Sequence, residues 1–217
     1  MKFKWPAFAQ VIGKSVVDWS DAWIDYEVIA LFWLISQVTI IFGPPVTFGV
    51  YYAINVLIRK GENVGIKGVL KGTKMYFWRG LGWGAMNWAV LIIGPIYLTF
   101  YGNLETNLGF FAHIVVLIVL VLWIIAQFYA LPFFMFQEKK KMFLAIRFGF
   151  FLALSTPLFT LGILVFAVIL LALCTLLIIP TFFGIPVLLM ILGTRALYDR
   201  LESFGLLKKV EDSREVE

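Results

Sequence analysis

Apolar stretches long enough to cross a lipid bilayer alternate with clusters of positive charge along this chain of 217 residues. A helix needs about 20 apolar residues to span the hydrocarbon. The chain is 62% hydrophobic and 14% charged, whereas soluble domains carry roughly 25% charged residues. Because so little polar surface cannot cover a compact globule in water, the sequence predicts an all-α, polytopic transmembrane bundle.

The positive charges lie on one side of the apolar stretches. The turns near residues 43–45, 102–111 and 180–186 contain no Lys or Arg, and cationic loops stay on the cytoplasmic side during insertion. The pattern predicts a multi-pass protein of the cytoplasmic membrane with both termini inside. The four clusters are Lys2, Lys4 and Lys14; Arg59, Lys60, Lys67, Lys71, Lys74 and Arg79; Lys139, Lys140, Lys141 and Arg147; and Arg195, Arg200, Lys208, Lys209 and Arg214.

The apolar stretches predict about six membrane segments in three hairpins. A cationic amphipathic stretch precedes each hairpin and is expected to lie along the cytoplasmic interface. Residues 1–207 are predicted to form a single transmembrane domain, and 208–217 a charged, disordered tail. The predicted segments are 28–42, 46–58, 81–101, 110–136, 158–179 and 186–197, and the amphipathic stretches are 7–23, 66–80 and 139–151.

Gly43, Pro44 and Pro45 interrupt the first apolar stretch. Consecutive prolines remove amide donors and disfavour helical geometry in the residue before them. We expect these residues to form the outer turn of a tight hairpin. Its arms of about 15 residues fall short of the ~20 of a full span, so both a spanning and a re-entrant hairpin stay open.

The third predicted segment has aromatic residues at both ends, as membrane helices do: Trp78 and Trp83 at the inner end, and Tyr97 and Tyr101 at the outer end. Small residues on one strip permit close approach of a neighbouring helix. Such a strip lies at the inner end, with Gly80, Gly82 and Gly84.

Amide side chains lie within the predicted segments at Gln37 and at three further positions, Asn55, Asn87 and Gln127. Amides at this depth ordinarily form interhelical hydrogen bonds of about 1 kcal/mol each, and this structural role is favoured. The alternative is that the three line a polar pocket.

No catalytic set is evident. Cys174 and His113 are the only residues of their types, and a hydrolytic nucleophile needs a base within hydrogen-bonding reach. There is no Gly-rich phosphate loop of the P-loop type. We expect neither an enzyme nor a bound cofactor or metal.

Charged residues at the cytoplasmic margin offer two hypotheses. The net charge of +5 fits attraction to anionic headgroups, at about 1 kcal/mol per well-placed cation, better than nucleic-acid binding; the candidate basic surface is Lys67, Lys71, Lys74 and Arg79. Four acids either form a solvated face, the favoured interpretation, or pair with Lys67, Lys71 and Lys74; these acids are Asp18, Asp21, Asp25 and Glu27.

Residues 31–80, from LFWLISQVTIIFGPPVTFGVYY to the basic stretch ending in MYFWRG, resemble the YesL family of bacterial membrane proteins, and the resemblance is best over about the first 90 residues. The matching positions are Thr39, Gly43, Pro44, Thr47, Tyr51, Arg59, Gly61 and Glu62. The doubled proline departs from the family pattern. Members have no established activity but tend to accompany carbohydrate-uptake systems, so the resemblance implies an accessory role beside carbohydrate uptake.

The sequence therefore predicts an accessory or assembly partner of a membrane system. Two alternatives stay open. One is a small transporter or permease subunit for an uncharged solute, with helices broken at Pro44, Pro132 and Pro180. The other is recruitment of anionic lipid by the basic stretches.

Overall fold

The computed structural model describes residues 6–177 and 184–207, and those ranges contain helices and no strand. The predicted tail 208–217 and the turn at Pro180 lie outside the described residues, as does the side chain of Cys174. The helices are α1 (Ala7–Asp21), α2 (Trp23–Val38), α3 (Gly43–Lys60), α4 (Gly65–Gly102), α5 (Asn107–Phe136), α6 (Met142–Ser155), α7 (Pro157–Leu177) and α9 (Ile185–Ser203).

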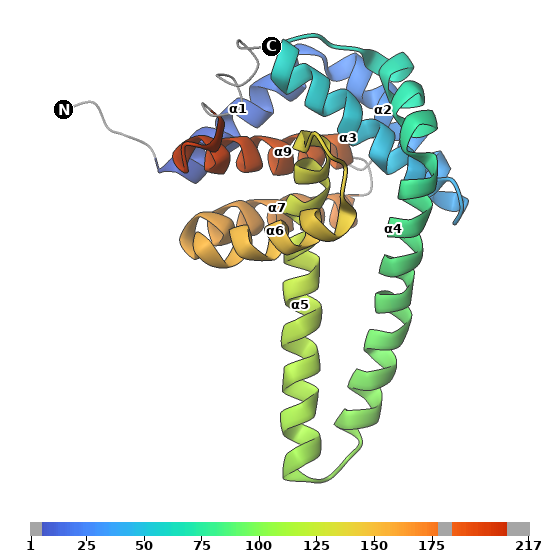
Figure 1. Ribbon diagram of the computed structural model, residues 1–217, viewed down its shortest axis with the longest axis vertical. Helices are drawn as coiled ribbons and strands as arrows, with labels where there is room; N and C mark the ends of the chain where they lie inside the picture. Colours follow the sequence, from blue (N-terminus) through green and yellow to red (C-terminus); the bar gives the residue numbers. More distant parts are fainter. Residues whose placement is uncertain (1–5, 178–183, 208–217) are drawn as a thin grey trace, which may run out of the picture.

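Two helices project far from the others (Figure 1). α4 and α5 form a long antiparallel hairpin, and the other helices gather around its open end. We call α1, α2, α3, α9 and the start of α4 the helical cluster. α6 packs against α5 close to this cluster, and α7 packs against α1 and α9.

Within the described residues, α4 and α5 are long and apolar enough to cross a membrane. α6 and α7 would together make a third such segment, but they meet at an angle of 103°. The helices break there because Thr156 precedes Pro157, and a residue before proline avoids helical geometry. The chain thus has the helices of a membrane protein, while the predicted arrangement of six segments is not confirmed.

α4 changes character at Tyr76, where the backbone leaves helical geometry (φ −111°, ψ 16°). The kink lies within the predicted amphipathic stretch 66–80, most of which precedes it, and the apolar segment follows as part of the same helix. Trp78 is 80% exposed just beyond the kink, and Tyr97 and Tyr101 stack near the far end. At about 1.5 Å per residue, Trp78 and Tyr97 are about 28 Å apart, close to the ~30 Å thickness of the hydrocarbon.

The predicted outer turn at Gly43, Pro44 and Pro45 is wrong. The chain turns at residues 39–42, and these three residues are the first of α3, where a missing amide donor costs nothing. All three are buried. A Cβ on Gly80 would come within 2.7 Å of the Pro45 Cα, and one on Gly84 within 2.4 Å of the Pro44 Cγ.

α3 therefore begins beside the inner end of the hairpin and runs back along the first half of α4. Gly49 packs against the backbone of Val69, and Gly72 against the Tyr52 side chain. The predicted glycine contact holds for Gly80 and Gly84. It does not hold for Gly82, where an added Cβ would meet no atom within 4 Å.

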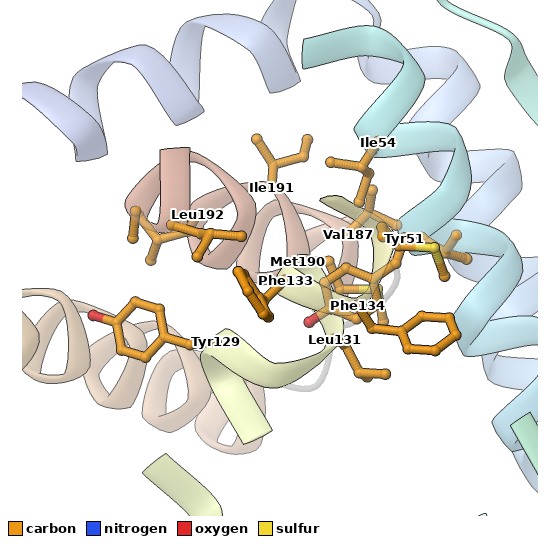
Figure 2. Packing of buried hydrophobic residues seen from close by; sticks show 14 of the residues in the cluster. Tyr51, Ile54, Tyr129, Leu131, Phe133, Phe134, Val187, Met190, Ile191 and Leu192 are labelled. Carbon is orange, nitrogen blue, oxygen red and sulfur yellow. The ribbon is translucent and has the colours of Figure 1, made fainter. Parts of the chain in front are cut away.

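The core lies where α3, the end of α5 and α9 meet (Figure 2). Ile54, Tyr129, Phe134, Ile191 and Leu192 are almost fully buried there. By contrast, no residue of α5 between 110 and 125 is buried. The apolar surface of the projecting hairpin is thus left for lipid to cover.

Candidate functional site

A cationic hollow of about 350 Å³ lies between α3, the start of α4 and the loop after α5. Arg59 and Lys60 reach it from the end of α3, and Lys140 from the loop at 137–141. The remaining lining residues are Tyr52, Asn55, Val56, Tyr76 and Met135.

A second hollow of about 360 Å³ continues from the first along α3 and α4, sharing Tyr52, Val56 and Lys60 with it. It adds Lys67 and Lys71, and Glu62 is its one acid. We call the two hollows the cationic groove. Within residues 6–177 and 184–207, none of the five cations lining it has a carboxylate oxygen within 4 Å.

Lys140 is held in an unusual position. Its Nζ donates a hydrogen bond to the Met135 carbonyl oxygen at 2.6 Å. Burial, together with the nearby charges of Arg59 and Arg79, lowers the pKa of Lys140 to about 8. Like charges thus converge here, at an energetic cost that a bound anion would offset.

The candidate basic surface Lys67, Lys71, Lys74 and Arg79 lies on the first part of α4, and all four side chains are exposed. Lys67 and Lys71 line the second hollow. The Arg79 guanidinium lies 6.0 Å from the Tyr76 ring and 5.9 Å from the Phe134 ring, within the range of cation–π attraction. The surface therefore adjoins the cationic groove.

The three predicted pocket amides do not lie together. Asn55 is buried in the first cationic hollow, where its Nδ2 donates to the Tyr198 hydroxyl at 3.1 Å. Asn87 lines another hollow of about 220 Å³ between the 39–42 turn and α4.

Asn87 and Gln127 instead join the two helices of the hairpin. Trp83 donates to the Gln127 Oε1 at 2.8 Å, and Trp123 donates to the Asn87 Oδ1 at 3.1 Å. In each pair the tryptophan and the amide lie on different helices: Trp83 and Asn87 are on α4, and Trp123 and Gln127 are on α5. The favoured interhelical role thus describes both amides.

The hypothesis that the four acids pair with the α4 lysines is wrong for Asp18 and Asp25, which have other partners. Asp18 accepts two hydrogen bonds from Arg195 of α9, at 2.6 and 2.8 Å, and Asp25 accepts one from Asn63. Asp18, Asp21 and Asp25 line an open hollow of about 620 Å³. Glu27 is partly buried, and burial raises the pKa of its carboxyl group.

Metal ligands are not gathered in the part of the chain that is described, which has no group of three or more His, Cys, Asp or Glu side chains in reach of one ion. His113 Nδ1 lies 2.9 Å from the Leu98 carbonyl oxygen, which links the two hairpin helices near their outer end. Comparison with protein-family models, curated proteins and solved structures yields no match for this chain.

Sequence reasoning missed two features of the site. It placed Arg59 and Lys140 in separate loops and had no means to bring them to one hollow. It also left Arg195 unpartnered, because no local pattern connects Arg195 of α9 with Asp18 of α1. Both features depend on contacts between distant parts of the chain.

Proposed function

We propose that this protein is an integral protein of the cytoplasmic membrane that acts without catalysis, as an accessory or assembly partner that engages anionic headgroups. The division of α4 at Tyr76 is the observation that carries the proposal. Before the kink, α4 exposes Lys67, Lys71 and Lys74; beyond Arg79, α4 has an apolar surface about as long as the hydrocarbon is thick.

In this proposal α4 and α5 cross the membrane, and residues 103–106 face the outside. Two crossings keep both termini on the cytoplasmic side, as the charge pattern predicts. The α6–α7 pair is then re-entrant, because a third crossing would move the following cationic residues outside. The bend of 103° supports this arrangement.

Labelling of intact cells with an impermeant thiol reagent tests the topology. In a Cys174→Ala background, Asn103→Cys is expected to react, and Glu62→Cys only after permeabilisation. Reaction of Glu62→Cys in intact cells would overturn the proposed orientation.

Lipid binding in nanodiscs tests the role of the basic surface. The triple variant Lys67→Gln, Lys71→Gln and Lys74→Gln is expected to retain phosphatidylglycerol about a hundredfold more weakly, at about 1 kcal/mol per cation. The matched triple change to Arg preserves the charge and should retain the lipid, as should Lys14→Gln on α1. Equal retention of phosphatidylglycerol by the Gln and Arg triple variants would contradict the proposal that the basic surface binds anionic headgroups.

The accessory role beside carbohydrate uptake comes from the YesL resemblance and remains a proposal. Copurification from native membranes, with and without the Gln triple, tests it by identifying bound proteins. The transporter alternative has weaker support, because Asn55 and Asn87 line separate hollows and the Asn87 and Gln127 amide oxygens accept tryptophan hydrogen bonds.

A further inference from the structure

The cationic groove combines two properties that a merely basic surface lacks. Its charges come from separate parts of the chain, α3, α4 and the loop at 137–141, and they line concave space. A row of lysines on one helix would attract any anion diffusely, whereas convergent charges favour a ligand of a particular size and charge.

The first hollow is also built from ordered groups. Asn55 is 7% exposed and bonded to Tyr198, and Lys140 is tied to the Met135 carbonyl oxygen. The rings of Tyr52 and Tyr76 lie 6.3 Å apart on the wall. Preorganised donors lose less entropy when they bind a ligand than free side chains do.

The charge of the hollow selects among anions. Arg59, Lys60 and Lys140 contribute three formal positive charges, with no acid among the lining residues. A carboxylate or a phosphodiester carries one negative charge, whereas a phosphate monoester carries about −1.5 to −2 near pH 7. Arginine also matches phosphate oxygens in a bidentate manner.

We propose that the hollow lined by Arg59, Lys60 and Lys140 is a binding site for a phosphate monoester. The inference rests on the proposed function, since it requires the start of α4 to face the cytoplasm. Tyr76 lies two residues before Trp78, so the hollow is at the height of the headgroups. The monoester is therefore supplied by a lipid headgroup or by a soluble phosphate ester.

Calorimetric titration of the full chain in nanodiscs tests the site. One arm uses phosphatidic acid in a phosphatidylcholine disc, and the other uses soluble glycerol 3-phosphate with pure phosphatidylcholine discs. Both probes carry the same monoester, so a preference for one identifies the source. Phosphatidylglycerol, a phosphodiester, is the comparison lipid.

Wild-type protein is expected to bind at least one monoester and to prefer phosphatidic acid over phosphatidylglycerol by about tenfold, the value of one additional charge-assisted hydrogen bond. Arg59→Gln and Lys140→Gln should each remove this preference and weaken monoester binding about tenfold. Lys140→Arg keeps the charge and should preserve much of the affinity. Lys14→Gln, which removes a charge from α1, should change neither value.

Three results would overturn the site: no binding of either monoester, equal affinity for the two lipids, or equal effects of Lys14→Gln and Lys140→Gln. Failure of the proposed function has a different signature, because the Lys67, Lys71 and Lys74 variants would then leave phosphatidylglycerol binding unchanged. Thermal unfolding of each variant checks that it is folded under the conditions of the titration.

Discussion

The projecting hairpin and the helical cluster both contain many large apolar side chains, but the hairpin exposes them and the cluster buries them. In the hairpin, α4 and α5 expose their large apolar side chains and join through a few polar pairs and small residues. In the cluster, large apolar side chains fill a core, and charged residues line hollows. Hydrophobic side chains thus stabilise the hairpin through contact with lipid, and they stabilise the cluster through contact with other side chains of the protein.

Gly80 and Gly82 offer the sharpest test of where the cluster ends. Gly80→Ala places a Cβ 2.7 Å from the Pro45 Cα and should lower the free energy of unfolding by about 1–3 kcal/mol. Gly82→Ala meets no atom within 4 Å and should raise it by about 0.5–1 kcal/mol, because alanine favours a helix. Thermal unfolding in detergent measures both. Equal effects would contradict the close contact of α3 with α4.

The Asp18–Arg195 pair tests whether the cluster depends on tertiary ion pairing. Its side chains are 19% and 28% exposed, so Arg195→Gln should lower the free energy of unfolding by about 1–2 kcal/mol. Lys71→Gln, on an exposed side chain, should have almost no effect. The swap Asp18→Arg with Arg195→Asp should recover part of the loss. Recovery by Asp18→Lys with Lys71→Glu instead would restore the hypothesis that α4 is the partner.

The hairpin should respond most to its tryptophan–amide pairs. Gln127→Leu removes the acceptor of Trp83, and a double-mutant cycle with Trp83→Phe should give a coupling of about 0.6–1 kcal/mol. The same cycle for Asn87 and Trp123 should give a similar value. Coupling near zero in both would mean that packing alone joins the helices.

Lys140 should give an effect on stability that depends on pH. Its pKa in the folded protein is about 8, below the ordinary 10.5, so the unfolded chain binds more protons between these values. The free energy of unfolding should therefore rise as pH increases from about 8 to 10.5. Lys140→Met should flatten this rise in a denaturation series and increase stability at pH 7, since it removes an unfavourably placed cation. A fall in stability over this pH range would contradict the burial of Lys140 near Arg59 and Arg79.

Much of the secondary structure could be predicted from local pattern. The charge clusters, the apolar segment of α4 with its aromatic ends, and the α5 segment all follow from residue type and spacing. The prediction of an outer turn at Pro44 was wrong because a pair of prolines occurs in the first turn of a helix as well as at a break between helices. The interfacial stretch near 139–151 corresponds to α6, but its angle to α7 depends on how α6 packs against α5 and how α7 packs against α1 and α9.

The candidate site was predicted only in part. Lys67, Lys71 and Lys74 recur at spacings of four and three on one helix, so their joint exposure follows from helical periodicity. Arg79 lies beyond the kink at Tyr76, and its exposure does not follow from this spacing. Arg59 and Lys140 are far apart in the chain, and their meeting at one hollow depends on how the end of α5 docks against α3.

By itself the sequence determined that this chain is helical, that it carries membrane-length apolar helices and that its cations are confined to particular stretches. These properties follow from local composition, because each helix bonds its own backbone and its solubility in lipid is a sum over its residues. Which apolar helices pack against protein instead of lipid, and which cations converge, depends on contacts between helices that are distant in the chain. Close glycine contacts between α3 and α4, together with the docking of α9 on the end of α5, determine this arrangement. They depend on the shapes of surfaces that are distant in the chain, so local sequence does not predict them.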